Sequence, residues 1–196
     1  MRQRSLRLAR WQPHAASVQP AAPMRAWLAA EGSLTARLVA HSRAFRVQRL
    51  HQKRTLCLPD EARVIGLPRP GRVWEREVLL RCDDTPVVFA HTVVPAGAHA
   101  GHWPLFSALG ERSLGTILFN DPLVARGQLE FARIRAGHPL MRRARAALGG
   151  GAGTTHYYAR RCVYRRHQGL LLVTEVFLPA VLDLVAAATT MKLNKR

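Results

Sequence analysis

The sequence has few acidic residues and no long hydrophobic run. Its 196 residues include 12 Asp and Glu against 30 Lys and Arg, so the formal net charge is +18. No stretch approaches the roughly 18 to 20 consecutive apolar residues that a membrane-spanning helix needs. We therefore expect no membrane span. Because 48% of the residues are hydrophobic, the chain has enough material for a sizeable core.

Cysteine is also scarce. The three cysteines, Cys57, Cys82 and Cys162, lie far apart and form neither a C-x-x-C pair nor an even disulfide count. Their spacing is typical of small core hydrophobes in a reducing compartment, which predicts a cytoplasmic protein.

Motifs for metal binding and for nucleophilic catalysis are missing as well. The nine histidines never form H-x-x-x-H or H-x-x-E-H, and His99 with His102 lacks a third nearby ligand. No G-x-S-x-G motif occurs, and no cysteine has the flanks of a catalytic thiol. We therefore expect no metal site.

The excess positive charge is typical of proteins that bind nucleic acids or anionic small molecules. It is carried almost entirely by arginines scattered along the chain, with lysine only at positions 53, 192 and 195. No zinc-finger, RNA-recognition or homeodomain pattern accompanies it. We therefore expect no nucleic-acid partner, although charge alone leaves that alternative open.

Hydrophobic periodicity predicts helices and strands in one α+β domain spanning 1–196. Two short helices are expected at 23–30 and 34–41, with Ser33 as the N-cap of the second. Alternation from Phe45 onward predicts a half-exposed strand. Further strands are expected in two hairpins, 72–82 with 85–95, and 157–166 with 169–177, so the sheet should be antiparallel.

Two segments are expected to lie outside the compact part of this domain. Residues near 141–157 contain an arginine cluster followed by "GGGAG", a composition typical of a flexible insertion. Residues 181–196 form a C-terminal extension that starts with helical periodicity.

Two charged residues of opposite sign lie within strands that are rich in apolar residues. The stretch "GLLLVTEVFLPA" has Glu175 as its only charge, and Arg76 occupies the centre of "WEREVLL". A buried charge is costly unless it is paired or lines a cavity that holds a polar ligand. A structural ion pair and a ligand cavity both remain open from these residues alone.

Four segments resemble the chorismate pyruvate-lyase family of ubiquinone biosynthesis, in this order: "VWEREVLLRCDDTPVVFAHTVVP", "SLGTILF", "YYARRCVYRR" and "LLLVTEVFLPA". The earlier "GSLTARL" resembles a helix start of that family, so the resemblance spans roughly residues 6–180. It implies an antiparallel six-stranded sheet with helices packed on one side. It also implies a carbon-oxygen lyase that eliminates pyruvate from chorismate to give 4-hydroxybenzoate, without a metal or organic cofactor.

The resemblance assigns roles to four residues. Arg76 would bind the ring carboxylate, Leu114 would contact the same group, and Glu175 would face the ring hydroxyl. Leu34 would form part of the apolar wall, where some relatives have Met. Tyr158 replaces a Trp often found at its position. Arg76 and Glu175 are thus the expected catalytic residues.

Two alternatives to a chorismate lyase remain. The same fold serves as a non-catalytic small-molecule sensor in bacterial regulators, but the residues ahead of Pro23 are too few for a winged helix. A basic nucleic-acid-binding module is the second alternative. For the lyase, we expect chorismate as the small-molecule partner and a monomeric chain.

Overall fold

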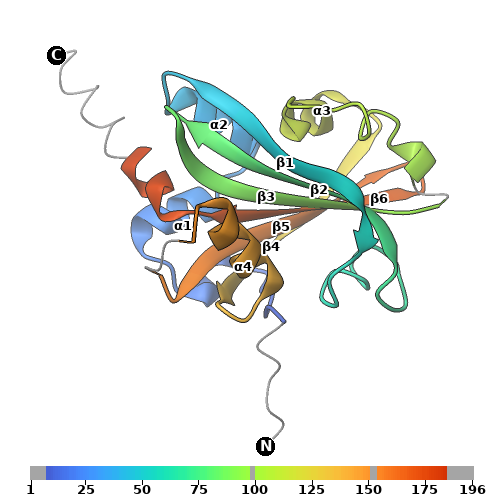
Figure 1. Cartoon of the computed structure of the whole chain (residues 1–196), viewed down its shortest axis with the longest axis horizontal. Helices are drawn as coiled ribbons and strands as arrows, with labels where there is room; N and C mark the ends of the chain where they lie inside the picture. Colours follow the sequence, from blue (N-terminus) through green and yellow to red (C-terminus); the bar gives the residue numbers. More distant parts are fainter. Residues whose placement is uncertain (1–7, 98–99, 151–153, 185–196) are drawn as a thin grey trace, which may run out of the picture.

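The computed structural model describes residues 8–97, 100–150 and 154–184, and its centre is one antiparallel sheet of six strands (Figure 1). The strand order across the sheet is β1-β2-β3-β6-β5-β4. This arrangement confirms the predicted α+β class and strand number. The strands are β1 (Phe45–Leu56), β2 (Arg72–Cys82), β3 (Thr85–Pro95), β4 (Val124–Arg135), β5 (His156–Arg166) and β6 (Gly169–Phe177).

Short helices connect or follow these strands. They are η1 (Ala15–Val18), α1 (Ala22–Leu28), α2 (Leu34–Ala40), η2 (Ala100–His102), α3 (Leu114–Asn120), α4 (Pro139–Ala147) and η3 (Pro179–Leu182). The two N-terminal helices lie within two residues of their predicted limits. Ser33 caps α2 as expected, because its hydroxyl accepts a hydrogen bond from the Ala36 amide at 3.3 Å. In the described part of the chain, no helix has the length and apolar content to cross a bilayer.

Both predicted hairpins are present. Asp83 and Asp84 join β2 to β3 with φ angles of 48° and 64°, so a two-residue turn with left-handed backbone reverses the chain. His167, with φ of 52°, opens the turn between β5 and β6. These turns fix the register, and therefore fix which side chains share a face of the sheet.

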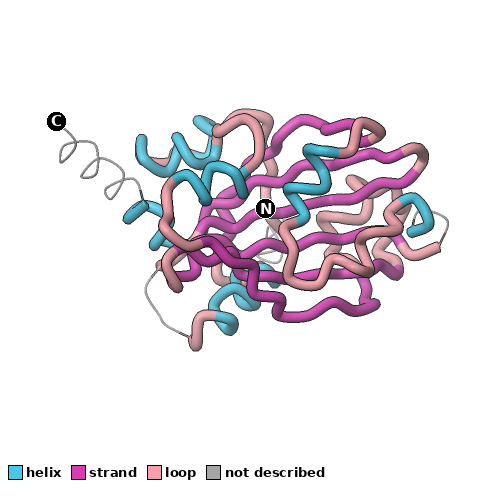
Figure 2. Tube along the Cα trace, turned by 90° about the horizontal axis from the view of Figure 1, so that it is seen from above, coloured by secondary structure: helices cyan, strands magenta, loops and turns pink. Residues whose placement is uncertain are grey.

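The two faces of the sheet have different covers. On one face, side chains of α1 and α2 pack with Val78, Leu80 and Ala90. Side chains of α3 pack with Val94 and Leu171 on the same face. Helix α4 packs on the other face, against Leu79, Phe89 and Val176. In Figure 1, α3 and α4 lie on opposite sides of the strands, and Figure 2 shows helices and loops over part of the sheet. The expected one-sided packing therefore describes the first three helices, while α4 adds cover to the second face.

The prediction of a flexible insertion is wrong for its first half. Residues 139–147 form α4, whose Leu140, Met141 and Ala144 are buried against the sheet. These apolar residues have the i, i+1, i+4 spacing of a helix face, and the arginines between them lie outside it. Gly149 and Gly150, with φ of 80° and 84°, follow the end of the helix. The "GAG" at 151–153 lies outside the described residues.

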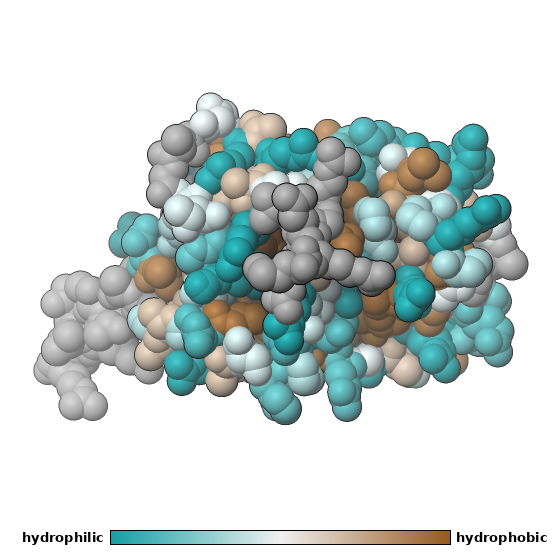
Figure 3. Space-filling view, turned by 90° about the horizontal axis from the view of Figure 1, so that it is seen from below, coloured by the Kyte–Doolittle hydropathy of each residue, from teal (hydrophilic) through white to brown (hydrophobic). Residues whose placement is uncertain are grey.

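The C-terminal extension begins inside the core. η3 directly follows the end of β6, and its Val181 is fully buried with the first helices and Phe177. The predicted helical segment is therefore present at its start, as a 3-10 helix, while residues 185–196 lie outside the described part. Seen from below, the molecule is mostly hydrophilic with hydrophobic patches between (Figure 3).

The burial of α4 leads to a stability prediction. Met141→Ala should lower the free energy of unfolding by about 2–5 kcal/mol, because it leaves a cavity between α4 and the sheet. Arg142→Ala, an exposed change on the same helix, should have little effect. Denaturant unfolding measures both. If the two variants were equally stable, α4 would not be packed as described.

Candidate active site

A cavity lies between the sheet and the first residues of α2 and α3. It encloses about 630 Å³ of empty space, a value that includes open solvent at its mouth. All four residues singled out from the sequence line it: Leu34, Arg76, Leu114 and Glu175. The structure thus brings together residues that are up to 141 positions apart in the chain (175 minus 34).

The starts of α2 and α3 meet at the cavity. The hydroxyls of Thr35 and Ser113 lie 2.6 Å apart and form a hydrogen bond. Gly115 permits this contact, since a Cβ at its position would lie 2.9 Å from the Thr35 hydroxyl. The contact holds Leu34 and Leu114, the first residues of the two helices, as neighbouring parts of the cavity wall.

Arg76 presents a buried guanidinium without a counter-charge. Its Nη2 donates to the carbonyls of Gly110 and Arg112, both at 3.0 Å, and its Nε has no hydrogen-bond partner. Burial, with a smaller contribution from Arg49, lowers the pKa of Arg76 to about 10. Among the described residues, no carboxylate pairs with it. Such a group favours an anionic ligand.

Glu175 lines the same cavity from β6, and its partner is Arg160 of β5. The Nε of Arg160 lies 2.5 Å from Oε2 of Glu175. Arg160 is itself almost fully buried, and its Nη1 donates to the carbonyls of Leu28 at 3.2 Å and Ala30 at 2.8 Å. The ion pair left open by the sequence therefore exists, but it joins Glu175 to Arg160 and leaves Arg76 unpaired.

Two further arginines of the cavity received no role from the sequence, namely Arg126 and Arg160. Arg160 belongs to "YYARRCVYRR", where alternation along β5 turns Arg160, Cys162 and Tyr164 toward the cavity. That alternation was a usable signal. Burial raises the pKa of the Tyr164 phenol, which also lines the cavity.

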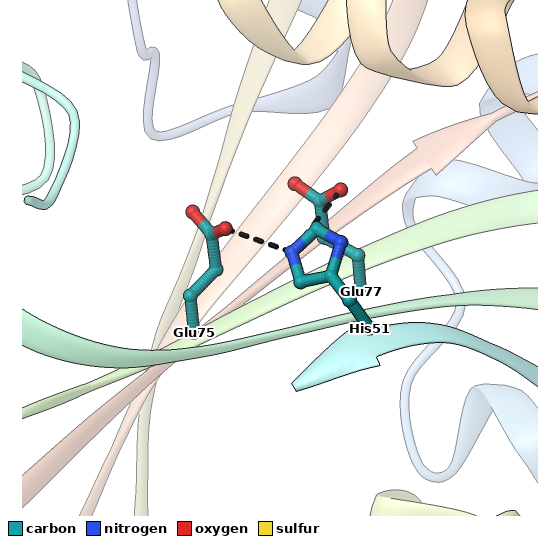
Figure 4. A group of neighbouring side chains, drawn as sticks. All are labelled: His51, Glu75 and Glu77. Atoms are coloured by element: carbon teal, nitrogen blue, oxygen red, sulfur yellow. Dashed lines mark hydrogen bonds and ion pairs between the residues drawn. The ribbon is translucent and has the colours of Figure 1, made fainter. Parts of the chain in front are cut away.

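A second polar cluster lies on the opposite face of the sheet. His51 Nε2 is 2.9 Å from Glu75 Oε1 and 3.7 Å from Glu77 Oε2 (Figure 4). One ligand-type atom from each residue lies within 4.8 Å of the others, an arrangement that can hold a cation. The Nη1 of Arg143 already lies 2.7 Å from Glu75 and 2.6 Å from Glu77. The positive charge beside these two carboxylates is therefore supplied by the chain itself.

His91 continues this cluster at full burial. Its Nε2 lies 2.9 Å from Glu61 Oε1, and its Nδ1 lies 3.0 Å from Glu77 Oε1. Burial alone would lower the pKa of His91, but the two carboxylates raise it to about 10. Burial would raise the pKa of Glu77, but His91 and Arg143 lower it to about 2. This face therefore carries a buried charge network, whereas the cavity face carries the candidate site.

Two solved structures have a fold similar to that of this chain. The effector domain of PhnF from Mycobacterium smegmatis matches with a TM-score of 0.52 and 18% identity, over 76% of this chain and 89% of that domain. The C-terminal domain of the histidine utilization repressor from Pseudomonas syringae matches with a TM-score of 0.51 and 14% identity, over 70% and 93%. At such identities the likeness concerns the fold alone, which is an α+β domain of the same class.

Sequence comparison identifies the family. The chorismate lyase family matches residues 5–186. A probable chorismate pyruvate-lyase of Ralstonia nicotianae is 52% identical over 79% of this chain and 80% of its own length. A probable chorismate pyruvate-lyase of Cupriavidus metallidurans is 48% identical over 85% of this chain and 78% of its own length. Another, of Dechloromonas aromatica, is 42% identical over 90% of this chain and 98% of its own length. The chain therefore belongs to the chorismate lyase family.

The raised pKa of His91 predicts how stability depends on pH. A histidine in the unfolded chain titrates near 6.5, so protonated His91 stabilises the fold fully below pH 6.5. That contribution is lost as the pH rises from 6.5 toward about 10. The difference in unfolding free energy between the wild type and His91→Gln should thus be largest below pH 6.5 and shrink above it.

Denaturant unfolding at pH 6, 8 and 10 measures this difference, with His14→Gln as the control at an exposed histidine. A difference that stayed constant across this range would mean that His91 is neutral in the folded protein.

Proposed function

We propose that this chorismate lyase eliminates pyruvate from chorismate in the cavity under α2 and α3, and releases 4-hydroxybenzoate. The observation that carries the proposal is that an unneutralised guanidinium, that of Arg76, and a carboxylate, that of Glu175, line the same cavity. The family match supplies the reaction class, and the cavity offers complementary groups for the two ends of the ring.

The proposed pose follows from the substrate's chemistry. Chorismate carries its ring carboxylate and its hydroxyl on opposite carbons of the ring. The carboxylate would receive the planar fork of Arg76, with Leu114 contributing contacts to the same group. The hydroxyl would then point to Glu175. Leu34 and Val78 form apolar wall between these polar groups and limit access of water, which strengthens each polar contact.

The chemical step needs little covalent help from the protein. The hydroxyl-bearing carbon loses its hydrogen as a proton, and the electron pair enters the ring as the neighbouring carbon-oxygen ether bond breaks. The leaving enolpyruvate takes up a proton on its methylene carbon and becomes pyruvate. Because the ring becomes aromatic, the step is strongly downhill. The tasks left to the chain are orientation, exclusion of water and stabilisation of shifting charge.

Glu175 is placed to act on the hydroxyl end. Its Oε2 is held by Arg160, which in turn is fixed by the Leu28 and Ala30 carbonyls. The other carboxylate oxygen can accept a hydrogen bond from the ring hydroxyl. In the transition state the same carboxylate can accept or relay the proton lost from the adjacent carbon. Arg160 is the positioning residue that orients it.

Other expectations from the sequence stay predictions. They are the place of the reaction in ubiquinone biosynthesis, a cytoplasmic location, a monomeric chain, independence from cofactors and the absence of nucleic-acid binding. Cofactor independence is supported by the cavity's chemistry, because its polar groups suffice for orientation and proton transfer. The His51 cluster lies on the opposite face of the sheet from Arg76 and is occupied by Arg143.

Turnover of chorismate tests the proposal. The pure protein should release 4-hydroxybenzoate and pyruvate in equal amounts, and the rate should persist in the presence of a strong chelator. Binding of chorismate without release of either product would indicate a sensor domain instead. Loss of turnover on chelation, with recovery on adding a divalent ion, would overturn the metal-free mechanism.

Arg76→Ala should weaken binding of both substrate and product. Removing the charged fork should reduce affinity by about 2–4 kcal/mol, roughly 30- to 1000-fold, and raise KM more than it lowers kcat. Arg76→Lys keeps the charge without the fork, so its affinity for substrate and product should lie between those of the wild type and Arg76→Ala. The control is Arg72→Ala, an exposed change on the same strand. Steady-state kinetics and titration with 4-hydroxybenzoate give the values. Unchanged product affinity in Arg76→Ala would remove the clamp role.

Glu175→Gln should lower kcat by about 10² to 10⁴, with a much smaller change in product affinity, because the amide keeps the shape but does not take up a proton. The matched control is Glu130→Gln, which makes the same change in another arginine-glutamate pair, that with Arg161 at 2.8 Å. Near-normal kcat in Glu175→Gln, combined with lost stability in Glu175→Ala, would show that the carboxylate only positions or stabilises.

A further inference from the structure

Three arginine side chains line the cavity, and only one of them is paired with a carboxylate. Arg160 is neutralised by Glu175 at 2.5 Å. Arg76 and Arg126 form no ion pair with any carboxylate of the described residues, and the Nε of each is buried without a hydrogen-bond partner. The cavity thus offers two uncompensated positive charges, where a ligand with a single carboxylate would neutralise only one.

Arg126 reaches the cavity because of an irregularity in β4. Arg126 pairs with Tyr164, but Leu129 pairs with Cys162, so three steps along β4 match two steps along β5. This extra residue is a β-bulge. In a regular strand, residues 126 and 129 would face opposite sides of the sheet. The bulge turns both Arg126 and Leu129 toward the cavity, which both of them line.

Gly127 is the residue that the bulge requires. A Cβ at this position would lie 2.9 Å from the Val163 carbonyl oxygen on the neighbouring strand. The Gly127 carbonyl also accepts a hydrogen bond from the Cys162 thiol, at 3.3 Å. The bulge is therefore a packed feature, and bulges beside active sites commonly redirect a side chain.

The surroundings of Arg126 keep its guanidinium at the cavity wall. Its central carbon lies 5.4 Å from the centre of the Phe119 ring of α3. Burial raises the pKa of the Cys162 thiol, and Arg126 opposes this effect, which places its charge near Cys162. The guanidinium therefore lies between α3 and β5, at the β4 side of the cavity.

The sheet order gives the direction of Arg126 from the proposed ring position. Arg76 is on β2 and Glu175 is on β6, while Arg126 on β4 lies two strands beyond β6, away from β2. The backbones of β4 and β6 are two strand spacings apart, which is about 10 Å. An extended arginine side chain spans much of this distance. In chorismate, the ether carbon that bears the enolpyruvyl group adjoins the hydroxyl-bearing carbon. In the proposed pose, the enolpyruvyl group of the substrate is therefore attached to the ring near Glu175, within reach of the Arg126 side chain.

We propose that Arg126, turned into the cavity by the bulge at Gly127, binds the carboxylate of the enolpyruvyl side chain. This inference rests on the proposed function. It makes Arg126 the residue that distinguishes the dianionic substrate from the monoanionic product: 4-hydroxybenzoate lacks the second carboxylate, so it leaves Arg126 without its ligand. The same contact stabilises charge on the departing enolpyruvate.

Substitution of Arg126 separates the two ligands. In Arg126→Gln, KM for chorismate should rise about 10- to 100-fold, whereas the inhibition constant of 4-hydroxybenzoate should change less than about twofold. Arg126→Lys should recover part of the loss. Arg76→Ala, by contrast, should weaken both ligands. Arg135→Ala is the matched control, because it removes one exposed charge from the other end of β4.

Thermal unfolding checks that the Arg126 variants are folded. The inference is overturned if KM for chorismate stays unchanged in folded Arg126→Gln. It is also overturned if the two constants rise by the same factor, since Arg126 would then contact the shared ring or support the wall. The proposed function is judged separately, by turnover of the wild type. If the wild type releases 4-hydroxybenzoate and Arg126→Gln has the same KM for chorismate, only the role of Arg126 is refuted.

Discussion

The ion pair between Arg160 and Glu175 is the interaction on which the cavity depends. A carboxylate in the apolar strand β6 is tolerable only with a partner, and Arg160 supplies that partner from the adjacent strand. Because Arg160 also bonds the carbonyls at the end of α1, it ties the N-terminal helices to the sheet that forms the cavity floor. The same ion pair therefore neutralises Glu175 and holds the cavity together, and it leaves Arg76 and Arg126 without a carboxylate partner among the described residues.

Buried charged residues are paired differently on the two faces of the sheet. On the α4 face, Glu61, Glu75 and Glu77 have positively charged partners within the chain, namely Arg143 and His91. On the cavity face, compensation is incomplete, and the excess is positive. Strand alternation separates the two sets, since neighbouring residues of β2 point to opposite faces. Among the described residues, the buried carboxylates of the α4 face are thus paired within the chain, whereas two guanidinium groups without a carboxylate partner line the cavity on the other face.

The sequence predicted the sheet, both hairpins and the four residues that meet in the cavity, because strand alternation and the family motifs are local signals. It did not reveal that Arg160 rather than Arg76 pairs with Glu175, since that depends on which strands become neighbours. The sequence did not predict that Arg126 lines the cavity, because a bulge shifts the alternation of β4 by one residue and no sequence pattern in β4 indicates the bulge. Helix α4 was missed because the arginines and glycines around it outweighed the short apolar face.

The orientation of the ring between Arg76 and Glu175 is the central claim, and a crystal structure with bound 4-hydroxybenzoate tests it most directly. The account predicts that the product carboxylate receives hydrogen bonds from the Arg76 guanidinium. It also predicts that the phenolic oxygen lies within hydrogen-bond distance of Glu175, with Arg160 still paired to that residue. A product bound in the reverse orientation, or bound outside this cavity, would contradict the account.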